Sequence, residues 1–110
     1  MRSETVMQAC GASGIPTAYF EWPEGTAPDL PWAVYYPVGD ETLFADGRRY
    51  AVVTRWCVEL ASRIGDAHAQ EAMGAALASA FGGYTVDCDY DRGEGCIVSE
   101  YEFTTCEPVK

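Results

Sequence analysis

The side chains with the clearest potential for chemistry form an alternating acidic run near the C-terminal end of the chain. Asp87, Asp89 and Asp91 are separated by single residues, as in the first half of an EF-hand calcium loop. Such a loop needs glycine at its sixth position and a bidentate glutamate at its twelfth, where this chain has Arg92 and Val98. We therefore interpret the run as the solvated face of a β-strand and assign no metal ligands.

The chain lacks the residue sets of common catalytic sites. His68 is the only histidine, so no second imidazole can share a zinc site with it, and the cysteines lack structural-zinc spacing. No Ser or Cys stands in a motif with a base and an orienting acid. The segment Gly11-Ala-Ser-Gly14 has no following Gly-Lys-Ser/Thr, so it is not a phosphate loop. We predict that the protein is not an enzyme and needs no cofactor.

The cysteines are expected to be reduced structural thiols. Their number, 5, is odd, and none stands in Cys-x-x-Cys spacing. No secretory signal is visible in Met1–Gly14, which favours a reducing compartment. Cys88 and Cys96 would nevertheless be able to face each other across a hairpin, so a disulfide between them stays open as an alternative.

Size and charge limit the classes of partner. A chain of 110 residues that is 48% apolar is expected to form one domain, residues 1–110. Its formal net charge of −10 opposes binding to nucleic-acid phosphates and to anionic membrane surfaces. Gly74–Gly83, the longest small and apolar run, is too short to span a bilayer. We expect no membrane and no sequence-specific nucleic acid among the partners.

Apolar periodicity predicts the elements of the first part of the chain. Residues 1–13 have the spacing of a short helix, and Ile15–Trp22 that of a strand. Prolines and glycines make Pro23–Pro31 a loop, which leads to a second strand at Trp32–Tyr36. The third strand is expected from Arg48 to Ala61, after an Asp-Gly turn.

The remaining elements are a helix and a second hairpin. Asp66 is a reasonable N-cap for a helix at Ala67–Phe81, and Gly82-Gly83 would close it. Strands are expected at Tyr84–Asp91 and Cys96–Thr105. The fold class is therefore α+β: a mainly antiparallel sheet covered by a helix between strands three and four and by a short N-terminal helix. The candidate acidic face of the second hairpin comprises Asp87, Asp89, Asp91, Glu100 and Glu102.

A polar segment, Pro37–Arg49, joins the second and third strands and is expected to project as a loop. It ends in Arg48-Arg49, the only adjacent basic pair of the chain. These arginines either solubilise a strand edge or pair with the acidic face of a neighbouring copy. The candidate subunit-interface residues of this segment are Asp40, Glu41, Phe44, Asp46, Gly47, Arg48 and Arg49.

One stretch resembles a known family. The run Tyr19-Phe-Glu-Trp-Pro-Glu-Gly-Thr-Ala-Pro-Asp-Leu-Pro-Trp-Ala-Val-Tyr35 is similar to a run that leads into the second strand of small tail-assembly proteins. These proteins belong to long-tailed bacteriophages and prophages of Gram-positive bacteria. The similarity continues through Phe44-Ala-Asp-Gly-Arg48, Val58-Glu-Leu60 and Ser99-Glu-Tyr-Glu-Phe103, whereas Trp32 stands where the family usually has Tyr.

The resemblance implies a tail terminator or tail completion protein, also described as head–tail joining. Such proteins form a ring, usually hexameric, that caps the tail tube and meets the head connector. The implied partners are further copies, the major tail tube protein and head connector proteins. The implied location is the virion tail, assembled in the cytoplasm of the bacterial host. The implied fold is an antiparallel sheet flanked by helices, with an extended loop between strands two and three.

A second interpretation comes from charge alone. A net charge of −10 and the acidic strand Asp87–Asp91 also suit an acidic, non-enzymatic binding module, such as a regulator or inhibitor that mimics DNA. In the ring interpretation the same charge would line a DNA conduit, since like charge lets DNA slide.

Overall fold

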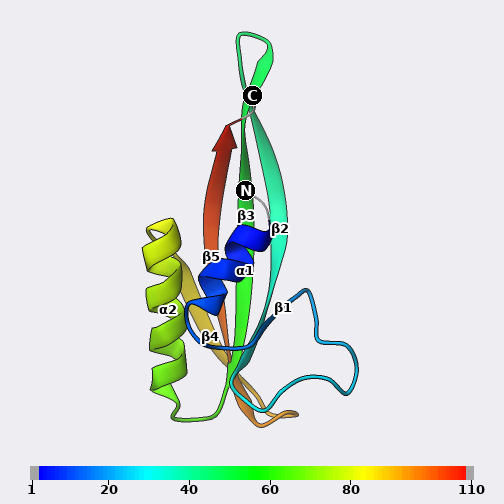
Figure 1. Cartoon of the computed structure of the whole chain (residues 1–110), viewed down its shortest axis with the longest axis vertical. Helices are drawn as coiled ribbons and strands as arrows, with labels where there is room; N and C mark the ends of the chain where they lie inside the picture. Colours follow the sequence, from blue (N-terminus) through cyan, green and yellow to red (C-terminus); the bar gives the residue numbers. More distant parts are fainter. Residues whose placement is uncertain (1–2, 109–110) are drawn as a thin grey trace.

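A long antiparallel pair of strands runs along the long axis of the protein in the computed structural model, which describes residues 3–108 (Figure 1). The two strands pair with each other from the base of the sheet to the Asp46-Gly47 turn. The sheet has the order β1-β2-β3-β5-β4, in which only β1 runs parallel to its neighbour. The strands are β1 (Thr17–Tyr19), β2 (Trp32–Ala45), β3 (Arg48–Ser62), β4 (Thr85–Asp91) and β5 (Cys96–Pro108).

Two helices, α1 (Ser3–Gly11) and α2 (Ala67–Phe81), pack on the same face of this sheet. The predicted bounds of α2 are confirmed, and local chemistry explains them. The Asp66 carboxylate accepts a hydrogen bond from the Ala69 amide at 3.2 Å. Gly82 ends the helix in the left-handed conformation, with φ of 85°. The expected fold class, α+β with a helix between the third and fourth strands, is confirmed.

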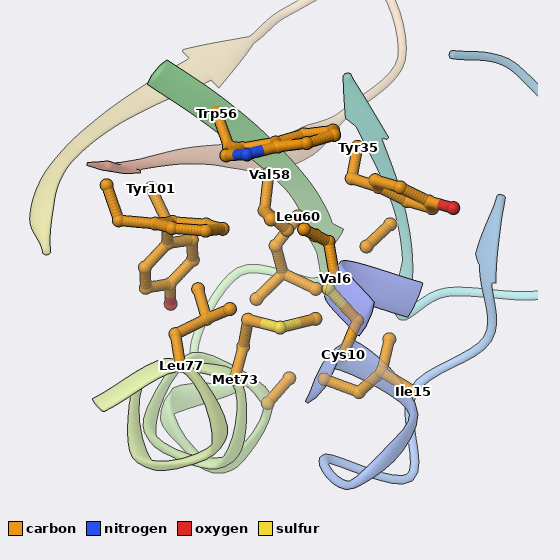
Figure 2. Packing of buried hydrophobic residues seen from close by; sticks show 13 residues of the cluster. Val6, Cys10, Ile15, Tyr35, Trp56, Val58, Leu60, Met73, Leu77 and Tyr101 are labelled. Carbon is orange, nitrogen blue, oxygen red and sulfur yellow. The ribbon is translucent and has the colours of Figure 1, made fainter. Parts of the chain in front are cut away.

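The core lies between the helices and one face of the sheet (Figure 2). Val58 and Leu60 of β3 point toward Met73 and Leu77 of α2, and Val6 of α1 closes the other side. All five side chains are fully buried. Because side chains alternate along a strand, the residues on either side of Val58 and Leu60 project from the opposite face of the sheet, which we call the helix-free face.

Two hydrogen bonds position aromatic side chains at the border of the core. The Tyr101 hydroxyl of β5 donates to the backbone carbonyl of Gln70 in α2 at 2.8 Å. The Trp56 indole Nε1 of β3 donates to Thr105 Oγ1 at 3.0 Å. Buried polar groups need such partners, and here they also fix α2 and β5 relative to β3.

The Pro37–Arg49 segment is not the loop that the sequence predicts. β2 does not end at Tyr36 but continues to Ala45, with register shifts between Pro37 and Gly39 and between Leu43 and Phe44. β1 ends opposite Tyr35, so β2 is an edge strand beyond that point. A proline beside a bulge is tolerated on an edge strand, and the ladder continues past it.

The elongated hairpin determines the shape of the molecule. The principal extents are 51 × 28 × 23 Å, and the radius of gyration is 15.2 Å. A globular domain of this length would have a radius of about 13 Å. The excess arises because the outer β2–β3 hairpin rises past both helices (Figure 1).

Two further expectations differ from the structure. The first strand is shorter than Ile15–Trp22, because only Thr17–Tyr19 has a partner in β2. The alternative of a Cys88–Cys96 disulfide is wrong, since every cysteine is free. Cys88 lies opposite Ser99 in the register and Cys96 lies opposite Asp91, which places the two thiols on opposite faces of the sheet.

Burial of Cys10 makes folding sensitive to alkaline pH. Desolvation raises the pKa of this thiol from 9.0 to about 12. Above pH 9 the unfolded chain releases the proton while the folded chain retains it, so the free energy of unfolding falls until about pH 12. Below pH 9 the contribution is complete and constant. We expect urea denaturation to show this loss, up to about 1.4 kcal/mol per pH unit from this group.

The control for this pH dependence compares two cysteine variants. Cys10→Ala should have a shallower alkaline slope, although Cys57 and Tyr101, whose pKa values burial also raises, keep it above zero. Cys106→Ala, at an exposed position, should retain the wild-type slope. An unchanged slope in Cys10→Ala would contradict the assignment.

Candidate functional site

The outer β2–β3 hairpin, residues Asp40–Tyr50, carries all the candidate interface residues, and we call it the arm. The last described pair between β3 and β5 joins Ala51 to Pro108. Within the described part of the chain, the end of the arm from Leu43 to Tyr50 is therefore a two-stranded ribbon (Figure 1). A two-stranded hairpin alone is marginally stable in water, so this segment depends on its turn and on whatever packs against it.

The turn of the arm has a defined geometry. Asp46 and Gly47 both have positive φ, 52° and 74°. Positive φ at both central residues is the signature of a type I′ turn, whose twist matches that of the flanking strands. Aspartate tolerates this conformation and glycine adopts it freely, so Asp46-Gly47 fixes the hairpin register.

Side chains at the end of the arm are exposed to solvent. Phe44 is 65% exposed and Tyr50 is 51% exposed. The irregularity after Leu43 pairs Phe44 with Arg49 and leaves Tyr50 without a partner residue in β2. Arg48 and Arg49 are exposed beside these rings. Exposed aromatic and arginine side chains together are the residue types enriched at the centres of protein interfaces.

The second group of candidate residues lies on the helix-free face of the sheet. The register sets Glu59, Glu100 and Asp87 in one row across β3, β5 and β4. Glu102 lies on the next row, opposite Cys57 and Thr85. Sequence patterns alone missed Glu59, because its place in the row depends on pairing with β5. We call this group the acidic face: Glu59, Asp87, Asp89, Asp91, Glu100 and Glu102.

Like charges directly opposite each other on a sheet are destabilising, so the acidic face costs stability. Asp89 and Asp91 accept hydrogen bonds from nearby backbone amides. Glu59 accepts one from a side chain: the Tyr36 hydroxyl donates to Glu59 Oε1 at 2.6 Å. Burial raises the pKa of Tyr36, and the contact with Glu59 raises it further. Tyr36 thus remains a hydrogen-bond donor at neutral pH and holds Glu59 in place.

An aromatic pair borders the acidic face. The Phe20 ring stacks on the Tyr36 ring with centroids 5.8 Å apart. Phe20 has φ of 65°, a left-handed conformation that is strained for a bulky side chain, and it is 53% exposed. We call Phe20 and Tyr36 the aromatic shelf. Phe20, the strained residue of the shelf, stays about half exposed in the isolated chain.

The structure separates the arm from the acidic face of the same chain. Arg48 and Glu59 both belong to β3, and a rise of about 3.3 Å per residue puts them about 36 Å apart. Arg55 lies between them, opposite Gly39 and Thr104. The basic pair and the acidic row therefore cannot meet within one chain.

Three further features of the described residues bear on metal binding and catalysis. Among residues 3–108, no group of three or more His, Cys, Asp and Glu side chains is placed to hold a metal ion. His68 is exposed in the first turn of α2. A hollow of about 390 Å³ near Trp32 and Cys96 is bordered by Asp91 and Glu94. Within the same described range, no helix is long and apolar enough to cross a membrane.

No protein-family model matches the chain, and a search of curated proteins finds no similar sequence. The functional argument therefore depends on the arm, the acidic face and the aromatic shelf.

Removing one charge from the acidic row should stabilise the protein. Glu100 lies opposite both Glu59 and Asp87, so Glu100→Gln relieves two repulsive pairs. We expect the free energy of unfolding to rise by about 0.2–1 kcal/mol at low salt. The gain should shrink in about 1 M salt, where the screening length is about 3 Å. Glu71→Gln, at an exposed position of α2, is the control, and an equal gain there would show that the gain does not come from repulsion within the row.

A substitution that strains the Asp46-Gly47 turn should loosen the arm and leave the core intact. Gly47→Ala places a side chain at φ of 74°, which costs about 1–2 kcal/mol. Amide hydrogen exchange should become faster within the arm, while exchange in β3 beside the core should stay unchanged. Gly83→Ala is the matched control, because a Cβ there meets nothing within 4 Å. Equal acceleration throughout the sheet would show that the arm is not a separate unit.

Proposed function

We propose that the protein is a structural component of the head–tail junction of a long-tailed phage or prophage. It forms a ring that completes or caps the tail tube and joins it to the head connector. The observation that carries this proposal is the arm, a hairpin that extends past the core with Phe44 and Tyr50 exposed beside paired arginines. The resemblance of Tyr19–Tyr35 and Phe44–Arg48 to phage tail-assembly proteins supplies the class.

Ring formation requires a contact between two different surfaces of each subunit. A head-to-tail contact of this kind closes into a ring when its rotation closes. A projecting arm suits that geometry because it reaches beyond its own core. Packing against a neighbour would also order a ribbon that is marginal by itself.

The charge suits a protein that surrounds DNA without holding it. Phosphate binding needs lysines and arginines, and this chain has 7 against 17 aspartates and glutamates. A surface of the same sign as DNA lets the duplex pass. The partners in this proposal are further copies, the major tail tube protein and the head connector.

Light scattering with and without the major tail tube protein of the same phage or prophage tests the proposal. We expect particles several times heavier than the 12.0 kDa chain, formed alone or on added tubes. Electron microscopy should show a ring at the tube end. A strict monomer that never joins tubes would exclude this role. A major tail protein gene immediately downstream would favour a terminator over another joining protein.

A second candidate function is an acidic binding module that mimics DNA. The row Glu59, Glu100 and Asp87 favours it, because adjacent strands space these carboxylates regularly, about 4.8 Å apart. Such a module would compete with DNA for a basic, nucleic-acid-binding host enzyme. Failure to recover any such enzyme in pull-downs would count against it.

A further inference from the structure

We infer that the end of the arm of one copy docks on the acidic face and aromatic shelf of a second copy. Arg48 and Arg49 pair with the row of Glu59, Glu100 and Asp87. This inference rests on the proposed function, because it names the surface that receives the arm within the ring.

Charge selects this pairing among possible contacts between copies. Two chains of net charge −10 repel each other unless their contact joins opposite charges. Arg48-Arg49 is the only adjacent basic pair in the sequence, and the row across β3, β5 and β4 is its complement. Arginine suits this site, since its planar fork donates hydrogen bonds to carboxylates in pairs.

Distance makes the contact intermolecular. Arg48 and Glu59 lie about 36 Å apart along the single strand β3, so the arm cannot fold back on its own acidic face. Donor and acceptor surfaces are different parts of the chain, as a heterologous contact requires. Such contacts propagate from copy to copy and close into a ring when the rotation between copies closes.

The receiving face is accessible at its outer carboxylates and partly pre-organised. Both helices pack on the other face; on this face Asp87 and Glu100 are exposed, while Glu59 is half-buried. The hydrogen bond from Tyr36 holds the Glu59 carboxylate at 2.6 Å. An incoming arginine would neutralise a row whose like charges repel each other in the isolated chain.

Aromatic side chains complete the complementarity. The shelf places the exposed Phe20 ring on Tyr36, next to Glu59. On the arm, Phe44 is exposed beside the arginines. Stacking of Phe44 on the shelf would bury both rings and offset the strain at Phe20. Arm and face thus match in charge and in apolar surface at the same time.

A charge-swap mixing experiment tests the inference. The arm variant is Arg48→Glu with Arg49→Glu, and the face variant is Asp87→Lys with Glu100→Lys. Each alone should weaken self-association by about tenfold or more, because like charges then meet at the contact. An equimolar mixture should restore the assembly: the reversed arm meets the reversed face, and the native arm meets the native face.

Charge-matched controls and a neutral variant separate pairing from folding. Arg63→Glu and Glu71→Lys change the net charge by the same amount per residue, away from the arm and the row, and should assemble as wild type. Phe20→Asn keeps a residue that tolerates positive φ but removes the ring. It should weaken self-association without lowering the free energy of unfolding.

The outcomes distinguish the inference from the proposed function. If wild type assembles and both charge variants assemble equally well, the docking inference is wrong while the ring proposal stands. If both charge variants fail to assemble alone and also fail when mixed, the pairing of the arm with the acidic face is wrong. If the arm variant loses only binding to DNA or to a connector protein, the arm has a different partner. A wild-type chain that never assembles, with or without tubes, overturns both.

Discussion

The long hydrogen-bond ladder between β2 and β3 is the constraint on which the rest of the structure depends. It sets the register that β3 passes to β5 and β5 passes to β4. A shift by one residue would move every side chain of a strand to the opposite face. The same ladder therefore turns Val58 and Leu60 toward the helices and Glu59 toward the acidic face.

The two faces of the sheet have opposite energetic roles. On the helix side, Leu60, Met73 and Leu77 are fully buried, and such side chains contribute about 1.5–3 kcal/mol each. On the other side, the acidic row loses stability through repulsion, at a few tenths to about 1 kcal/mol per pair. Burial on one face is thus large enough to tolerate repulsion on the other.

Features determined by local chemistry could be predicted from the sequence. Helix α2 was predicted to the residue because Asp66 and Gly82 act on the backbone beside them. The Asp46-Gly47 turn is equally local. The continuation of β2 past Pro37 could not be predicted, since it depends on two bulges and on β1 ending early. Register is likewise non-local, which is why Glu59 was missed and why a Cys88–Cys96 pair stayed open as an alternative.

Three costly features of this chain lie outside the helix-covered core. The carboxylate row repels itself, Phe20 is strained and exposed, and the arm extends as a ribbon past its neighbours. Each would be relieved by a further layer of protein that is basic and aromatic. The arm is the segment of the chain that combines both properties. The arm ends far from the face of its own chain, so in the docking that we propose the layer that relieves these costs comes from another copy.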